Sequence, residues 1–131
     1  KNGYIYIELC GEDEIFLNLS MKPCVYAAKP EVHQDAGKVA VQYGPVVYCA
    51  EAVDNGANLK SIFLPIEAEF TLVPDEKTGL PALETTAYRQ KEQDALYVPA
   101  EKEEEIRLRM IPYHAFANRG ASEMPVWLKR K

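Results

Sequence analysis

Two apolar runs separated by a tight turn constrain the fold of this chain more than any other feature of its sequence. They lie in residues 35–51, which read DAGKVAVQYGPVVYCAE. In the first run Val39 and Val41 alternate with polar or small side chains, which is the period-2 pattern of a half-buried strand. A glycine and a proline then interrupt the pattern, because glycine tolerates positive φ and proline removes an amide donor. We expect this stretch to organise the fold.

The second run, VVYCA at residues 46–50, favours a buried strand, although periodicity alone does not separate so short a run from a buried helix segment. Alternate side chains of a strand point to opposite faces. We therefore expect at least one of Val46 and Val47 to face the core. A buried carboxylate without a partner costs several kcal/mol, so the expected result of Val47→Asp is an unfolded or strongly destabilised chain.

Short runs of the same kind recur along the whole sequence. Residues 3–9 and 14–19 predict two strands of a hairpin. Further strands are expected at 21–28, 61–64, 67–73, 83–89, 106–110 and 124–128, and one helical turn at 30–36. Nine prolines and seven glycines are spread evenly between these runs. About ten short strands with such punctuation predict an all-β fold, an antiparallel, jelly-roll-like β-sandwich or a barrel.

Composition narrows the class of protein and its partners. A length of 131 residues with 47% apolar side chains fits one globular domain. The formal net charge of −5 argues mildly against a nucleic-acid partner. No apolar run approaches the roughly 20 residues that a membrane helix needs. Three cysteines without a close pair argue against a disulfide framework, and the N-terminus shows no signal peptide, so a cytoplasmic location is favoured.

The carboxylates do not have the pattern of a catalytic pair. Glycosidases need two carboxylates that flank the bond they cleave. The acidic residues of this chain instead lie in predicted turns, at 12–14, 75–76 and 101–105. Because Asp and Glu are usually exposed, solubilising loop charge is the stronger interpretation of all three groups.

Motifs for metals and nucleophiles are missing from the sequence as well. His33 and His114 are too few and too far apart for a zinc signature, and Cys10, Cys24 and Cys49 form no CxxC motif. The sequence also contains no HExxH, no GxSxG elbow and no glycine-rich phosphate loop. We therefore assign no catalytic, cofactor-binding or metal-binding residue to this chain.

Aromatic side chains leave one alternative open. A sugar-stacking platform on a sheet face would need several of them on one side. Tyrosines are also good strand formers with a polar rim, which explains them without a ligand. The candidates are Tyr4, Tyr6, Tyr26, Tyr43, Tyr48, Tyr88, Tyr97, Tyr113 and Trp127.

Two long stretches of this sequence resemble a known family. They are residues 35–51, followed by VDNG at 53–56, and IPYHAFANRGASEMPVW at 111–127. The segment LYVPAEKEEE at 96–105 and the opening GYIYIE fit the same region. Together they are similar to the C-terminal region of glycoside hydrolase family 127, the β-L-arabinofuranosidase family.

The resemblance implies a longer parent enzyme, in which a helical barrel is followed by β-sandwich domains. Residues 1–28 would be the last hairpin of a preceding sandwich, or the first strands of the same one, and residues 29–131 the C-terminal sandwich. In this family the proposed nucleophile is a zinc-bound cysteine in the helical barrel. No cysteine of this chain matches those motifs, so zinc is implied for the parent's catalytic domain alone.

Three hypotheses follow from the residues and the resemblance. The first is a non-catalytic C-terminal domain that supports the helical barrel of its parent and takes part in a homodimer. The second is a carbohydrate-binding module for plant-type, arabinose-containing glycans. The third is an independent small enzyme. An open reading frame that continues upstream into a helical-barrel domain would favour the first.

Overall fold

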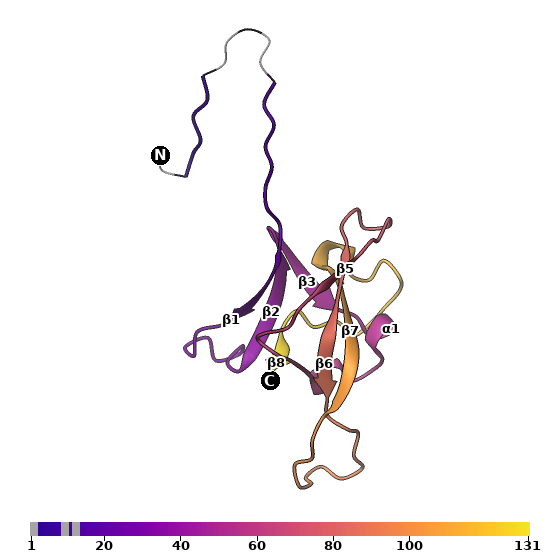
Figure 1. Ribbon diagram of the computed structural model, residues 1–131. Coiled ribbons are helices and arrows are strands. Elements are labelled where there is room, and N and C mark those ends of the chain that lie inside the picture. The colour runs from indigo at the N-terminus through magenta and orange to yellow at the C-terminus, as the bar shows by residue number, and fades with distance from the viewer. Residues whose placement is uncertain (1–2, 9–10, 12–13) are drawn as a thin grey trace.

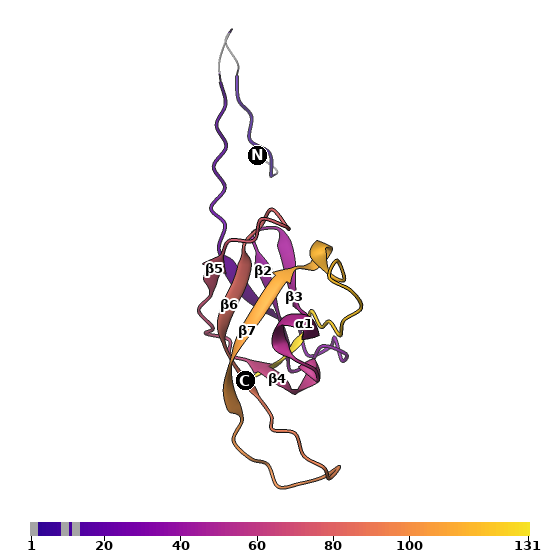
Figure 2. The same cartoon turned by 90° about the vertical axis from the view of Figure 1, so that its right-hand side faces the viewer.

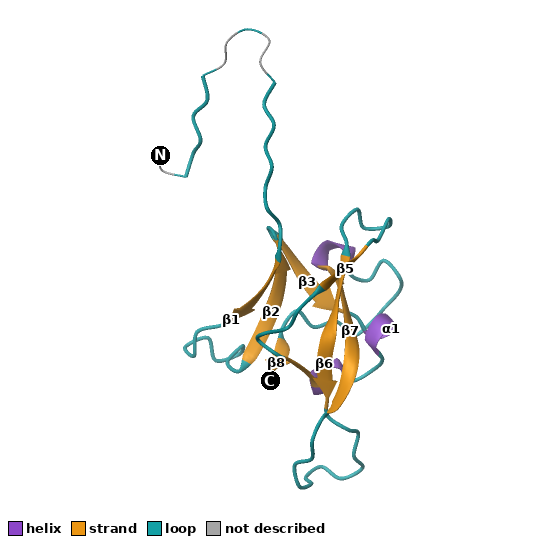
Figure 3. Cartoon of the chain, viewed as in Figure 1, coloured by secondary structure: helices purple, strands orange, loops and turns teal. Residues whose placement is uncertain are grey.

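The computed structural model describes residues 3–8, 11 and 14–131, and most of its regular elements are short strands (Figures 1 and 3). The elements are β1 (Pro23–Ala27), β2 (Lys38–Tyr43), β3 (Val46–Ala50), α1 (Ala52–Asn55), η1 (Leu59–Ser61), β4 (Ile62–Leu64), β5 (Thr71–Val73), β6 (Ala82–Arg89), β7 (Glu104–Pro112), η2 (Tyr113–Ala115) and β8 (Leu128–Arg130). Among the described residues, no helix combines the length and the hydropathy needed to cross a membrane.

A single sheet of eight strands forms the body of the molecule, which confirms the all-β class. Seven strands follow the order β1-β2-β3-β7-β6-β4-β8, and β5 pairs with β6 beside this path. Because β8 pairs with β4 on one side and with β2 on the other, the sheet folds back on itself in a sandwich-like arrangement. The β4–β8 pairing is parallel, so the sheet is mixed and not antiparallel throughout.

The main hydrophobic core lies inside this folded sheet. Val39 and Val41 of β2 face it, as do Tyr48 and Ala50 of β3, and all four are buried. The same core contains Leu59, Ile62, Leu64, Leu83, Ala87, Leu108, Met110 and Leu128. A fully buried Val or Leu contributes about 1.5–3 kcal/mol. Residues 35–51 therefore supply the two central strands that the sequence predicts.

A smaller apolar cluster covers part of the opposite face of the sheet. It contains Cys49, Ala82, Ile111 and Ala115, with Val73, Met124 and Val126 packed against them. Cys49 pairs with Ile111 across β3 and β7. Strand β3 is thus buried on both faces over its second half, which explains its nearly continuous apolar sequence.

The expectation for Val47 is wrong. Val46 packs against the main core, as the alternation requires of one of the two valines. Val47 points to the other face, opposite Gln42 of β2, and 41% of it is exposed. A carboxylate at this position would meet water, so Val47→Asp has no reason to unfold the chain.

The predicted N-terminal hairpin does not form strands here. Figures 1 and 2 show residues 14–22 leaving the sheet as an extended segment, at the end where β2 turns into β3. Neither residues 3–8 nor residues 14–19 belong to a strand, and Leu9 of the first predicted strand lies outside the described residues. A two-stranded hairpin without a further strand or a packed face is marginally stable, which accounts for the difference.

Two other elements differ from expectation for local reasons. Residues 30–36 form successive turns and no helix, with the N–H groups of Val32 and Asp35 bonded three residues back. The last strand is Leu128–Arg130 and not 124–128, because residues 123–125 are held as a loop. Their carbonyls accept hydrogen bonds from the N–H groups of Ala50 and Ala52.

Candidate functional site

A buried carboxylate, Glu51, fastens a distant loop to the end of β3. Only 1% of Glu51 is exposed. Its Oε1 accepts a hydrogen bond from the Ala117 N–H at 2.9 Å, and its Oε2 accepts one from the Arg119 guanidinium at 2.5 Å. Arg119 also binds Asp54 of α1. The bond to Asp54 is the main reason that the pKa of Arg119 is raised, so this guanidinium stays charged between two carboxylates.

A second ion cluster lies on the outer face of β6 and β7. Glu84 and Arg109 are partners in register, and Arg109 Nη1 donates to Glu84 at 3.0 Å. Arg107 binds the same carboxylate, and Arg109 also reaches Asp75 at 3.4 Å. Burial acts to raise the pKa of Glu84, but the hydrogen bonds and charges of the two arginines outweigh it and hold that pKa below its ordinary value. Glu84 is thus poorly suited to donate a proton as a general acid.

The acidic turns singled out in the sequence have solvated or structural positions. Glu14, Glu76, Glu101, Glu104 and Glu105 are exposed, and Glu12 and Asp13 lie outside the described residues. Asp75 belongs to the Arg109 cluster, and Glu103 pairs with Lys131 at 2.9 Å. Asp75 and Glu76 line one hollow together with Arg119, the partner of Glu51, whereas residues 103–105 line a separate one.

The described cysteines and histidines lie on separate elements. Cys24 is on β1 and Cys49 on β3, both with free thiols, and Cys10 lies outside the described residues. Burial and the charge of Glu51 raise the pKa of Cys49 to about 12, so this thiol is poorly suited to act as a free thiolate nucleophile. His33 and His114 are both exposed.

Whether the described side chains could hold zinc depends on how they are grouped. Within residues 3–8, 11 and 14–131, no three His, Cys, Asp or Glu side chains are grouped so that they could hold a metal ion. A structural zinc site takes four such ligands, and a catalytic site takes three.

The aromatic side chains do not share one face. Tyr48 is buried and packs edge-on against Tyr43, with the ring centroids 6.3 Å apart. Its hydroxyl donates a hydrogen bond to the Pro81 carbonyl. Tyr88 lies under the Lys131 ammonium, 3.6 Å from the ring centre. Tyr113 stacks with Phe116, and the exposed Tyr26 belongs to β1. This dispersion does not favour an extended sugar-stacking platform.

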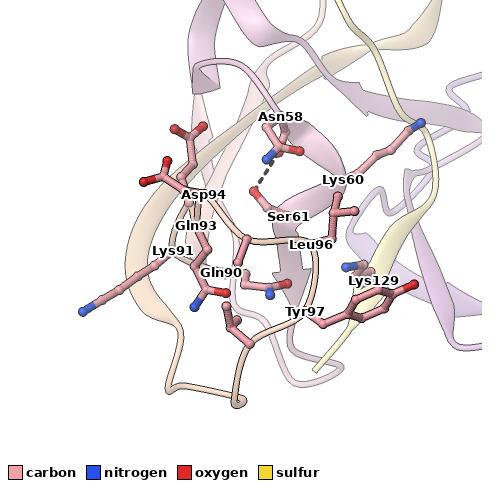
Figure 4. A pocket seen from close by; sticks show the side chains of 13 residues that line it. Asn58, Lys60, Ser61, Gln90, Lys91, Gln93, Asp94, Leu96, Tyr97 and Lys129 are labelled. Carbon is pink, nitrogen blue, oxygen red and sulfur yellow. Dashed lines mark hydrogen bonds between the residues drawn. The ribbon is translucent and has the colours of Figure 1, made fainter.

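A polar hollow of about 630 Å³ lies beside the long loop that connects β6 to β7 (Figure 4). Its lining includes Ser61, Lys60 and Lys129 on the sheet side, and Leu96 and Tyr97 from the loop. The Ser61 hydroxyl already donates to a backbone carbonyl, and Leu96 and Tyr97 are each 94% exposed. The aromatic ring is thus presented to solvent without packing that would fix it as one wall of a sugar site.

The sequence did not predict the ion pair that holds the loop at residues 117–119 to the end of β3. Glu51 ends an apolar run, and Arg119 stands in an Asn-Arg-Gly turn, 68 residues further along the chain. Either position is compatible with a solvated charge. The one usable signal was the acidic residue placed directly after a strand that is buried on both faces.

Comparison with known proteins decides what kind of domain this is. The family described as glycoside hydrolase family 127 C-terminal domain matches residues 23–129. The chain belongs to this family. The glycoside hydrolase family 127 domain therefore starts at the first residue of β1 and ends within β8.

Individual relatives of this family 127 domain are much longer proteins. A non-reducing end β-L-arabinofuranosidase of Bifidobacterium longum subsp. longum is 36% identical over 99% of this chain, which corresponds to 22% of that protein. The crystal structure of a GH127 β-L-arabinofuranosidase from Geobacillus stearothermophilus T6 superposes with a TM-score of 0.77 at 43% identity. A further GH127 β-arabinofuranosidase superposes with a TM-score of 0.72 at 37% identity.

The shares of length show how little of each relative this domain represents. The match to the Geobacillus enzyme covers 86% of this chain and 19% of that protein, and the match to the other structure covers 86% and 18%. The chain thus spans about a fifth of the relatives that it resembles.

Proposed function

We propose that this chain is a non-catalytic C-terminal domain of a β-L-arabinofuranosidase-type glycoside hydrolase. Its role is to support the catalytic helical barrel of the same polypeptide. The observation that carries the proposal is the match over nearly the whole chain to about a fifth of the β-L-arabinofuranosidases. The buried carboxylate Glu51 agrees with a structural role, because it binds the loop at Ala117 and Arg119.

We further propose that the zinc chemistry of such an enzyme resides outside this chain. A zinc site needs at least three grouped ligands, and among the described residues Cys24 and Cys49 belong to no such group. Elemental analysis of the purified 131-residue chain should find much less than one zinc per chain, since a single structural site would give about one.

The N-terminal residues have a role in the same proposal. Residues 3–8 and 14–19 are the two strands of a hairpin that belongs to the preceding sandwich of the full-length protein. In support, the family match begins at residue 23, while the Bifidobacterium enzyme aligns with 99% of the chain. Strand β1 pairs along its whole length with β2 and so belongs to the C-terminal domain itself.

The test compares three proteins, which are the full-length gene product, the same product ending at residue 22, and the 131-residue chain. Release of nitrophenol from a p-nitrophenyl β-L-arabinofuranoside measures activity. We expect the full-length protein to be active, the 131-residue chain to be inactive, and the shortened protein to lose thermal stability and activity together. Turnover by the 131-residue chain that survives repurification would overturn the proposal. So would a shortened protein as stable and active as the full-length one.

A further inference from the structure

A row of three side chains, of which two are half-buried and the third is exposed, crosses the outer face of the sheet near the β2–β3 turn. Cys24 of β1 pairs with Gln42 of β2, and Gln42 pairs with Val47 of β3. Directly paired residues point to the same face of a sheet. Val47 ends this row and is a β-branched apolar residue with 41% of its surface exposed.

Two aromatic rings continue the apolar surface beyond Val47. Tyr113 follows Pro112, the partner of Tyr48, so Tyr113 emerges at the level of Val47. Its ring stacks on Phe116, with the centroids 6.4 Å apart and the planes inclined by 14°. Tyr113 is 50% exposed and Phe116 36%. Figures 1 and 2 show η2 at the end of the molecule from which the N-terminal segment, residues 3–8 and 14–22, projects. We call this segment the arm and this end the arm end, and we call Val47, Tyr113 and Phe116 the arm-side surface.

The base of that segment is fixed by a close contact. A Cβ atom at Gly44 would lie 2.7 Å from the Met21 side chain, so Met21 packs directly on the β2–β3 turn. Gly44 has a φ of 55° and is the residue type that accepts both the contact and the conformation. The chain before Pro23 therefore starts from the same end of the sheet as the arm-side surface.

The segment itself requires protein on both of its sides. Ile5 and Tyr6 are each 79% exposed, and Phe16 and Leu17 are 88% and 69% exposed. Neighbouring side chains of an extended chain point in opposite directions. Large apolar groups on both faces are the pattern of a strand that is covered on both sides. The body that covers this segment must therefore lie at the arm end.

We propose that the arm-side surface is the docking site of the domain that precedes residue 23 in the full-length polypeptide. That domain takes residues 3–8 and 14–19 into its own sheet and covers Val47, Tyr113 and Phe116 with apolar side chains. The inference rests on the proposed function, since about four-fifths of each relative lies outside this chain. It adds the face on which the two parts meet.

Thiol labelling can locate this contact. Val47→Cys and Tyr113→Cys are made separately, in the full-length polypeptide and in the 131-residue chain, with Cys10 and Cys24 replaced by serine. Leu96→Cys is the matched control, because Leu96 is 94% exposed on the loop at the opposite end of the molecule (Figure 1). The measured quantity is the rate of alkylation by iodoacetamide at each site, determined by peptide mass spectrometry.

Both test sites should react slowly in the full-length polypeptide and quickly in the 131-residue chain. A difference of roughly tenfold or more is expected, since a packed interface must open before the thiol can react. Leu96→Cys should react equally in both proteins. Equal rates for the two test sites in both proteins would overturn the inference, as would equal slowing at Leu96→Cys. Protection that disappears on dilution would assign the surface to a second copy and would also overturn it.

These outcomes separate the inference from the proposed function. A coding sequence that begins at residue 1, or a shortened protein that remains fully stable and active, contradicts the proposed function. Fast labelling of both test sites in a full-length enzyme that depends on its C-terminal domain contradicts only the docking surface. In that case the two parts meet elsewhere.

Discussion

Replacement of Glu51 by alanine should destabilise the chain more than its position at the end of a short strand suggests. The substitution removes the acceptor of the Ala117 N–H and one of the two carboxylates that bind Arg119. Hydrogen bonds to a charged group contribute about 1.5–3 kcal/mol each, and breaking a buried ion pair costs about 3–5 kcal/mol. Arg119 keeps its bonds to Asp54 and its side chain is 33% exposed, so the lower end applies, about 3 kcal/mol.

Urea unfolding of the 131-residue chain measures this loss. With a slope of about 2 kcal/mol per molar urea, the midpoint of Glu51→Ala should lie about 1.5 M below that of the parent. Glu51→Gln keeps an acceptor for Ala117 and should lose about half as much free energy of unfolding. Glu101→Ala is the control, because Glu101 is exposed. If Glu51→Ala and Glu101→Ala unfold at the same midpoint, the buried carboxylate does not hold the loop.

Two further predictions use the same assay. Val47→Asp should change the free energy of unfolding by no more than about 0.5 kcal/mol, because Val47 is exposed. Val41→Asp buries a carboxylate in the core and should lower the free energy of unfolding by several kcal/mol. Equal urea midpoints for the two variants would contradict the faces assigned to these valines. Because the folded-state pKa of Glu84 is depressed, its ion pairs stabilise the fold above the unfolded pKa of about 4.3 and are lost as pH falls through the folded value. Glu84→Gln should therefore have a lower free energy of unfolding than the parent at pH 7, and should lose less of it between pH 7 and about pH 3. If the free energies of unfolding of the variant and the parent fall in parallel, the Glu84 ion pairs do not stabilise the fold.

The strands of the main core were predictable because their local pattern of apolar residues agrees with the packing that they have in the folded sheet. Alternation in β2 and β7 reports one buried face, and both strands form with the expected side chains inward. The N-terminal hairpin failed for the opposite reason. Its alternation is as clear, but the described residues offer it no third strand, and strand pairing is stable only within a larger sheet.

The candidate site was predictable only at the level of the family. The stretches 35–51 and 111–127 carry the resemblance, and the family match over residues 23–129 confirms it. The ion cluster of Glu51 and Arg119 joins residues 68 positions apart, and local patterns carry no information about such a distant pair. The homodimer, the glycan partner and the cytoplasmic location stay predictions.

Strand β3 is apolar throughout, but one of its residues is not buried by the described part of the chain. Val46, Tyr48 and Ala50 belong to the main core, and Cys49 is covered on the outer face by the loop after η2. Val47 alone is left exposed, at the end of the sheet from which residues 14–22 depart. A strand that is apolar on both faces is ordinarily buried on both. The same reasoning applies to Ile5, Tyr6, Phe16 and Leu17. A single neighbouring domain at the arm end satisfies both requirements, whereas two unrelated partners would be needed if the surfaces lay at opposite ends.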